Sequence, residues 1–375
     1  MESSRGQLSI LGFEGFDGGS HQQVRRSLSA YSRHRWQWIT RPGRSWKWRM
    51  RTGAMELIEE AGRQGAFDAR PDVIFVTSMV SGGDLRALLP VGLRNCPLVI
   101  YMHENQAVYP FRSTTSMQKS RDHQFALTNL TSLAAADLVI WNSHWNQESF
   151  CEGIEELLDK SPDGKLRQVR GWVSEKSIVC WPPVEPPNGV LHNTQEADNT
   201  GRGRMATGIT RIVWPHRWEH DKGPNTLLRL ARYLRHRSPG RYRWTLLGEQ
   251  YRKIPRSLDR FLDEFTGDID HAGWVESREE YWSHLKRCDW VLSTARHEFF
   301  GIAVVEAMLA GCLPWLPNRL SYPEITPAVA HGLSPEGSIV DRAEVQQCLL
   351  KHLEPCVPRL AVGNLDNHLE TIAGR

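Results

Sequence analysis

The sequence contains no long hydrophobic segment. No run of about 18 apolar residues, the length that a membrane-spanning helix needs, occurs in its 375 residues. The polar N-terminus also lacks the apolar core of a secretory signal peptide. We therefore expect a cytoplasmic protein without a membrane anchor.

Cysteine motifs are also missing. The seven cysteines are scattered, odd in number and never spaced as Cys-x-x-Cys, which argues against a zinc site and against a disulfide framework. A strong net charge is absent too, because the formal net charge is only +3. That charge is uneven: residues 33–51 hold seven basic residues and no acidic one. This predicts a local positive surface that attracts an acidic partner.

The length exceeds what a single hydrophobic core usually supports, so we expect two domains. Short apolar runs alternate with helical stretches throughout, which is typical of the α/β class. A stretch rich in proline, asparagine, threonine and glycine over residues 183–208 reads as a linker. The predicted domains are therefore residues 1–182 and 209–340.

The stretch from Ser293 to Met308 carries the clearest chemistry. A short apolar strand, Trp290–Leu292, precedes it, and a helical run, Ile302–Ala310, ends it. The first N–H groups of a helix have no partner within the helix, so the backbone at Phe300 and Gly301 can hold a phosphate without a side chain.

Two carboxylates bracket this turn. Glu298 precedes the helix and Glu306 lies inside it. By helical rise they are at most about 12 Å apart, a spacing that suits two hydroxyl-bearing parts of one extended ligand better than an acid/base pair. We interpret that ligand as a sugar, a diphosphate and a ribose. The alternative is that Glu306 is an exposed helix residue and that Glu298 is an acid favoured by the helix dipole.

The basic segment is also rich in tryptophan, with residues at 36, 38, 46 and 48. Indole rings provide stacking surfaces for bases, and cations neutralise phosphates. We therefore predict nucleic-acid binding by Arg44, Trp46, Lys47, Trp48, Arg49 and Arg51. The alternative is a half-buried strand over residues 37–40, followed by a helix that starts near Trp46, with the arginines around a small core.

Two loops of the first domain follow predicted strands. Gly18 and Gly19 separate the first strand from the first helix, where backbone can approach a ligand closely, although the turn is not a full G-x-G-x-x-G. His103 and Asn105 follow a strand over residues 97–102, at the sheet edge where open α/β proteins bind ligands. The alternative there is a loop that these side chains merely cap.

One loop of the second domain carries two cations. Arg217 and Lys222 lie five positions apart between a strand and a helix. They can converge on a diphosphate and neutralise a leaving group without a metal. The alternative is a pair of surface cations.

Together these motifs resemble a known family. Glu298 and Glu306 match the E-x7-E signature of retaining GT-B glycosyltransferases of the family 4 type. Four further stretches resemble the branch that glycosylates queuosine in tRNA, the tRNA-queuosine α-mannosyltransferases: Phe16–Gln22, Trp46–Arg51, Tyr101–Gln106 and Trp141–Asn146.

This resemblance implies a GT-B fold, with two Rossmann-like domains facing a central cleft. It implies retaining, metal-independent transfer of mannose from GDP-mannose to queuosine in a tRNA anticodon. His103 and Glu298 would hold the sugar, Glu306 the ribose, and Arg217 with Lys222 the departing GDP. The other donor-binding residues that it implies are Gly18, Gly19, Glu249, Phe300 and Gly301. The acceptor residues would be those of the basic segment together with Asn105.

The resemblance also bears on metal and on the C-terminus. Asp268-Ile269-Asp270 looks like the D-x-D metal motif of GT-A enzymes, but the surrounding pattern is that of GT-B, so we expect a loop there and no metal. GT-B chains usually return a terminal helix to the first domain, and we expect residues 341–375 to do so through a helix over Arg342–Leu353. Two other functions stay open: transfer to a small-molecule or glycan acceptor, and a tRNA-binding protein with a vestigial sugar-nucleotide site.

Overall fold

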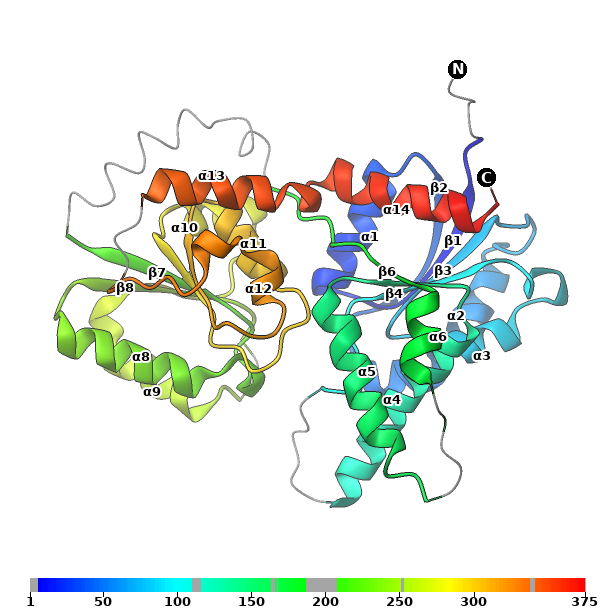
Figure 1. Cartoon of the computed structure of the whole chain (residues 1–375), viewed down its shortest axis with the longest axis horizontal. Coiled ribbons are helices and arrows are strands. Elements are labelled where there is room, and N and C mark those ends of the chain that lie inside the picture. Colours follow the sequence, from blue (N-terminus) through cyan, green and yellow to red (C-terminus); the bar gives the residue numbers. More distant parts are fainter. Residues whose placement is uncertain are drawn as a thin grey trace. The chain divides into compact units, whose positions relative to one another are not determined.

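The chain forms two compact α/β units. The computed structural model describes residues 6–109, 116–162, 166, 168–186, 208–250, 253–337 and 341–374. One unit comprises Met1–Pro183 and Pro355–Arg375, and the other comprises Val184–Glu354 (Figure 1). Each unit has one parallel sheet, which confirms the predicted class of two Rossmann-like units. Most of the expected linker, residues 187–207, lies outside the described residues.

The first unit contains a six-stranded sheet in the order β2-β1-β3-β4-β5-β6. All of its neighbouring strands pair in parallel. Its strands are β1 (Ser9–Asp17), β2 (Arg35–Pro42), β3 (Val73–Thr77), β4 (Leu98–Met102), β5 (Leu138–Trp141) and β6 (Ser177–Val179). Its helices are α1 (Gly19–Tyr31), α2 (Trp46–Arg63), α3 (Gly82–Leu88), α4 (Ser116–Ala135), α5 (His144–Leu158), α6 (Val169–Glu175) and α14 (Pro358–Ile372), with the short 3-10 turn η1 (Val91–Leu93).

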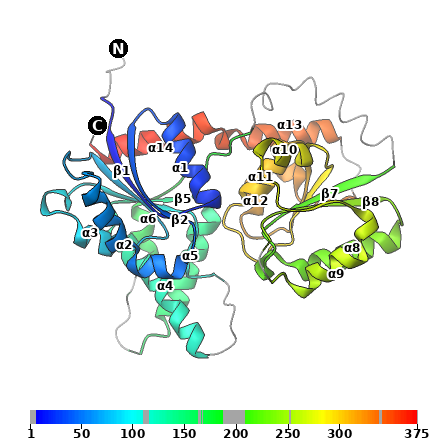
Figure 2. The same cartoon turned by 180° about the vertical axis from the view of Figure 1, so that it is seen from behind.

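Both faces of this sheet are covered, because strands such as β3 and β4 are buried along their whole length. Helices α2 to α6 pack their apolar residues on one face. Helices α1 and α14 cover the other face, and the two lie side by side in Figures 1 and 2.

The helix that returns to the first unit is α14 and not the one we expected. The predicted helix over Arg342–Leu353 is α13 (Arg342–His352), but it packs against α11 and β11 of the second unit. Helix α14 instead buries Val362, Leu365 and Leu369 on the first sheet. The spacing of these residues forms one helical stripe. A buried carboxylate of α14, that of Asp366, also accepts hydrogen bonds from Ser32 Oγ at 2.7 Å and Arg33 N at 3.0 Å.

The second unit contains a five-stranded parallel sheet in the order β11-β10-β7-β8-β9. Its strands are β7 (Thr210–Pro215), β8 (Tyr242–Leu247), β9 (Ile269–Gly273), β10 (Trp290–Leu292) and β11 (Leu313–Trp315). Its helices are α8 (Pro224–Arg237), α9 (Arg256–Glu264), α10 (Arg278–Lys286), α11 (Ile302–Leu309), α12 (Tyr322–Ile325) and α13. Short 3-10 turns are η2 (His220–Lys222), η3 (Thr266–Asp268), η4 (Ala328–Ala330) and, after α13, η5 (Glu354–Cys356).

The Asp268-Ile269-Asp270 tripeptide has a structural role. Ile269 and Asp270 begin β9, so the loop that we expected here is partly a strand. Asp270 Oδ1 accepts a 2.8 Å hydrogen bond from Arg243 Nε on the neighbouring strand β8. This ion pair explains the acid without a metal.

Among the helices of the described residues, none is long and apolar enough to span a bilayer.

Candidate active site

A tight pair of loops holds the predicted donor residues of the second unit together. The loop after β7 ends at Gly223, which begins α8 with a φ of +69°. A Cβ atom on Gly223 would lie 2.0 Å from the carbonyl oxygen of Thr294, in the loop after β10. Only glycine permits both this backbone conformation and this contact, so the two loops lie against each other at Lys222.

Lys222 and Glu298, predicted separately from sequence, meet in this place. Lys222 Nζ lies 3.2 Å from Glu298 Oε2 and 3.4 Å from Asp221 Oδ2. It also donates a 3.0 Å hydrogen bond to the carbonyl oxygen of His297. Among the described residues Lys222 is the only buried lysine or arginine. The structure therefore excludes the alternative that Lys222 is a surface cation.

Two histidines beside this lysine are neutral. Burial, and next the charge of Lys222, lowers the pKa of His297 to about 3. The same two causes hold the pKa of His216 well below its ordinary value, and its Nε2 lies 3.0 Å from Ser293 Oγ. The buried positive charge at this site thus resides on Lys222.

Gly301 shapes the start of α11 as expected. It has a φ of +96° and precedes the helix without any side-chain cap, so the first N–H groups of α11 receive no side-chain acceptor. Phe300 is buried, and its carbonyl oxygen accepts a 2.9 Å hydrogen bond from Ser321 Oγ. This arrangement presents helix N–H groups one turn from Glu298, where an anion is favoured.

Glu306 is buried and not an exposed helix residue. Only 3% of its surface is exposed, and Arg278 Nη1 donates a 2.7 Å hydrogen bond to its Oε1. The Tyr281 hydroxyl is a second hydrogen-bond partner, and burial followed by the charge of Glu306 holds the pKa of Tyr281 well above its usual value. Arg278 and Tyr281 were not predicted from sequence, because their link to Glu306 crosses from α10 to α11.

The two other predicted donor residues lie nearer the surface. The side chain of Arg217 is about half exposed, and its Nη2 is 3.6 Å from Glu219 Oε2. Glu249 is exposed, and its backbone carbonyl accepts a 3.1 Å hydrogen bond from Trp218 N.

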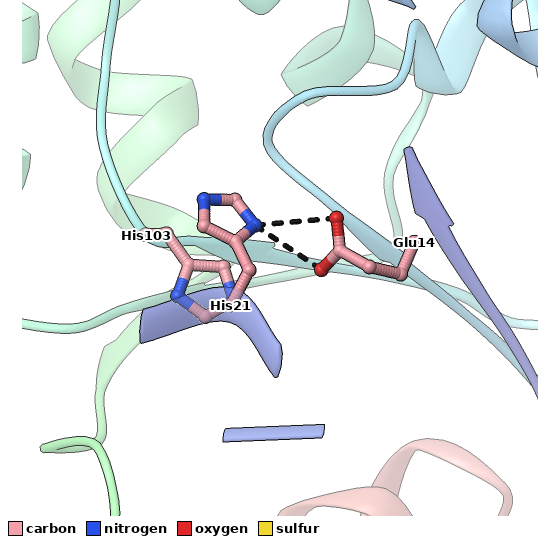
Figure 3. A group of neighbouring side chains, drawn as sticks. All are labelled: Glu14, His21 and His103. Atoms are coloured by element: carbon pink, nitrogen blue, oxygen red, sulfur yellow. Dashed lines mark hydrogen bonds and ion pairs between the residues drawn. The ribbon is translucent and has the colours of Figure 1, made fainter. Parts of the chain in front are cut away.

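The first unit has its own polar cluster at the carboxyl ends of β1, β3 and β4. It consists of Glu14, His21 and His103 (Figure 3). Glu14 is fully buried, and His21 Nδ1 lies 3.1 and 3.2 Å from its two oxygens. Glu14 Oε1 also accepts hydrogen bonds from Thr77 Oγ1 at 3.0 Å and Phe16 N at 2.7 Å. Only His103 of this cluster was predicted as a site residue.

The two histidine rings stack, with centroids 3.9 Å apart and planes 25° apart. Burial alone would lower the pKa of His21, but the charge and hydrogen bond of Glu14 outweigh it and raise that pKa. Burial, and next the charge of His21, holds the pKa of His103 well below its usual value. The arrangement therefore favours the protonated form of His21, beside a carboxylate, and the neutral form of His103.

Ligand atoms of these three residues lie within 4.8 Å of one another, so they are candidate metal ligands. The geometry favours hydrogen bonding instead. Imidazole lone pairs lie in the ring plane, so two nearly parallel rings do not converge on one ion, and His21 Nδ1 is already held by Glu14.

The glycine turn differs between its two residues. A Cβ atom on Gly18 would lie 3.2 Å from Gly43 Cα, so this glycine allows a close backbone contact within the unit. Gly19 has a φ of +52°, and a Cβ atom there would meet nothing within 4 Å. Gly19 thus leaves open space beside the first turn of α1, whereas Gly18 is explained by its close packing against Gly43.

Asn105 supports its loop and does not lie at the surface. It is completely buried, and its Nδ2 donates to Asn146 Oδ1 at 2.9 Å and Ser149 Oγ at 3.2 Å. Its Oδ1 accepts from the backbone N–H of Ala107 at 3.1 Å. The alternative of a capped loop therefore holds for Asn105, and we do not retain this residue as an acceptor contact.

The aromatic–basic segment divides into a structural part and an exposed part. Trp36 and Trp38 on β2 stack on each other at 4.9 Å and pack edge-on against Phe75. Arg49 is mostly buried and paired with Glu56 of the same helix. The alternative assignment of elements was right, because β2 spans Arg35–Pro42 and α2 begins at Trp46.

The exposed part is the first turns of α2. Trp46 packs against Phe125 at 5.2 Å, whereas Trp48 points outward and is 65% exposed. The two differ because neighbours two apart on a helix face opposite ways. Arg44, Lys47 and Arg51 are exposed, and Arg51 also lies over the Phe125 ring at 5.2 Å. These side chains form a cationic surface around one exposed indole.

Comparisons with known proteins agree with this division. Residues 9–184 match the family profile described as tRNA-queuosine alpha-mannosyltransferase N-terminal, and residues 206–344 match the family of glycosyl transferases group 1. A solved structure, the N-terminal domain of Candida albicans trehalose-6-phosphate phosphatase, superposes with a TM-score of 0.68 at 10% identity, over 99% of this chain and 98% of that one. This likeness concerns the fold, and the predicted GT-B architecture is confirmed.

Two relatives agree at the level of sequence. The GDP-mannose:cellobiosyl-diphosphopolyprenol alpha-mannosyltransferase of Xanthomonas campestris is 30% identical over 159 residues, which cover 42% of this chain and 40% of that protein. The tRNA-queuosine alpha-mannosyltransferase of Drosophila melanogaster is 35% identical over 319 residues, which cover 85% of this chain and 81% of that protein. The chain therefore belongs to the tRNA-queuosine alpha-mannosyltransferase family and is a glycosyltransferase of the GT-B fold.

Proposed function

We propose that the protein transfers mannose from GDP-mannose to a hydroxyl of queuosine in a tRNA anticodon. The observation that carries this proposal is the buried Lys222–Glu298 pair beside the uncapped start of α11, in a chain of this family. The mannosyl donor is supported by the names of both relatives, and the GDP carrier by the name of the Xanthomonas protein.

The donor roles follow from charge and hydrogen bonding. Lys222 and the N–H groups of α11 stabilise the negative charge that develops on the departing diphosphate. Glu298 accepts hydrogen bonds from the sugar hydroxyls and Glu306 from the ribose. The 2.7 Å hydrogen bond from Arg278 Nη1 orients the Glu306 carboxylate for this contact. Because these groups supply the charge stabilisation, we propose that transfer needs no metal and persists in excess chelator.

The acceptor side rests on the first turns of α2. Lys47 lies in the first turn of α2, at the positive end of the helix dipole, so its charge does not stabilise the helix. An exposed indole among cations is instead the arrangement that binds RNA, through stacking and phosphate neutralisation. His103 contacts the transferred sugar as a neutral imidazole.

Replacing Trp48 by alanine is expected to weaken tRNA binding by about tenfold, because stacking on one aromatic ring contributes on the order of 1–3 kcal/mol per base. Met55→Ala is the matched control, since Met55 is a large apolar residue on the same helix and is 54% exposed. Fluorescence anisotropy with labelled tRNA measures both. Equal binding by Trp48→Ala and wild type, or an equal loss in Met55→Ala, would show that α2 does not stack on RNA.

The function itself is tested by mass analysis of nucleosides from queuosine-containing tRNA incubated with the protein and GDP-mannose. GDP-glucose and UDP-sugars run in parallel. The expected result is one hexose added to queuosine, with GDP-mannose alone as donor. Release of GDP without a modified nucleoside would point to a small-molecule or glycan acceptor, and tRNA binding without GDP release would point to a vestigial donor site.

A further inference from the structure

A basic groove lies between α8 and α9 of the second unit, which run side by side (Figure 1). Its volume is about 440 Å³, and its lining includes the side chains of Asn225, Arg229, Arg232, Arg256, Ser257 and Arg260. Four arginines thus share one groove, and its lining residues within the described part of the chain include no carboxylate. None of these residues belongs to the donor site described above.

The placement of these arginines opposes helix stability. Arg256 is the first residue of α9, so its charge lies at the positive end of that helix dipole, where a cation is unfavourable. The pairs Arg256/Arg260 and Arg229/Arg232 also bring like charges together at helical spacings that destabilise a helix. Stability of the fold therefore does not explain the groove.

Most of this charge is not neutralised within the protein. Arg232 Nε donates a 2.8 Å hydrogen bond to Glu264. Among the described residues, Arg229, Arg256 and Arg260 form no ion pair. All four arginine side chains are exposed. Arg229, Arg256 and Arg260 are thus solvated guanidinium groups that an external anion can reach, whereas Arg232 is already paired with Glu264.

We propose that this groove binds the sugar-phosphate backbone of the tRNA acceptor, as a second RNA-binding surface besides the first turns of α2. The inference rests on the proposed function. Exposed cations hold a single small anion weakly because water and salt screen each pair. A polyanion gains from all of them at once, since each phosphate that is neutralised releases a condensed counterion. Arginine also matches phosphate in a bidentate geometry.

The test compares two double variants that remove the same charge. Arg256→Gln with Arg260→Gln removes two of the four arginine charges of the groove. Glutamine has a helix propensity similar to that of arginine. Lys286→Gln with Arg287→Gln, at the end of α10, is the matched control, because both of those residues are exposed cations of the same unit outside the groove. Binding of tRNA is measured between about 50 and 200 mM salt.

The groove variant is expected to bind tRNA about tenfold more weakly, with the slope of log K against log salt reduced by about 2. The control is expected to match wild type. The unfolding temperature of the groove variant should not fall below that of wild type, because the substitutions remove a like-charge pair. At saturating tRNA, kcat and the KM for donor stay unchanged, while the KM for tRNA rises.

Failure of this inference differs from failure of the proposed function. If wild type modifies queuosine but both double variants bind tRNA as tightly as wild type does, the groove is not an RNA-binding surface. If wild type modifies no queuosine while the groove variant alone loses tRNA affinity, the groove is an RNA-binding surface but the proposed reaction is wrong. Unchanged tRNA binding with lost affinity for anionic phospholipid vesicles would also overturn the inference.

Discussion

Replacing Lys222 by methionine is expected to lower kcat for sugar transfer by about 10²- to 10³-fold, the usual effect of removing one preorganised charge-stabilising group. Lys222 is buried, and the two histidines beside it are neutral because of burial and its own charge. No other buried cation of the described residues can replace it. The measurement is single-turnover transfer at saturating donor and tRNA.

The same change also breaks an ion pair. Removing Lys222 leaves Glu298 without its partner at 3.2 Å, and a broken, largely buried pair costs on the order of 3 kcal/mol. Loss of activity in Lys222→Met could therefore reflect instability. Lys222→Met combined with Glu298→Gln separates the two causes, because it removes the uncompensated charge of Glu298, whereas that of Asp221, 3.4 Å from Lys222 Nζ, is the same in both variants.

The double variant is expected to recover part of the thermal stability, namely the part lost at Glu298, and none of the transfer. tRNA binding should stay at the wild-type level in both variants, because both residues belong to the donor site. Recovery of transfer together with stability would show that the pair is only structural and would remove Lys222 and Glu298 from the mechanism. Lys286→Gln serves as the surface-charge control, with activity equal to wild type.

Replacing His103 by alanine is expected to lower kcat/KM by about 10²-fold, within the range of a side chain that assists transfer by hydrogen bonding or proton exchange. The role requires the neutral imidazole. Burial and the adjacent His21 hold the pKa of His103 well below 6.5, so wild-type activity should not decline on account of this group as the pH falls from 8 to about 6.5.

The pH profile tests the coupling to Glu14 and His21. His21→Gln removes a positive charge beside His103, so the pKa of His103 rises and the acid limb of kcat/KM moves to higher pH. Glu14→Gln lowers the pKa of His21, because the carboxylate that favours its protonated form is lost. Near neutral pH this again removes positive charge, so the limb moves in the same direction. Burial remains the largest cause of the low pKa of His103, so each variant raises that pKa only part of the way to its ordinary value.

Several charged groups around this cluster contribute to the profile. Glu104 and Asp17 also favour protonation of His21, and they stay unchanged in both variants. Thermal unfolding controls for loss of the buried hydrogen bonds from Thr77 and Phe16 to Glu14. An acid limb that stays in place in both variants, or that moves in opposite directions, would show that His21 does not control His103.

The fold class and the donor loops could be predicted from sequence because their signals are local. Alternating apolar strands and helices indicate parallel sheets, and polar residues at strand ends mark the ligand edge of such sheets. Lys222, Glu298 and Gly301 each stand at such a strand-to-helix turn. The stretch from the end of β1 to the start of α1 also contains Glu14 and His21, but we selected only its glycines as site residues. A carboxylate followed by a histidine at the end of a first strand was the signal that could have found them.

Contacts between distant parts of the chain could not be read from these patterns. The stacking of His21 on His103, the bond from Arg278 to Glu306 and the burial of Asn105 each depend on which strands and helices become neighbours. Tertiary packing also places part of the tryptophan-rich segment against the core, since Trp36 and Trp38 are partly buried on Phe75 whereas Trp48 is exposed. Packing also sets the charge of a titratable group, because loss of water, neighbouring charges and hydrogen bonds together shift its pKa. Residue types at local spacing thus determine which chemistry is present, and long-range packing decides which side chains can perform it.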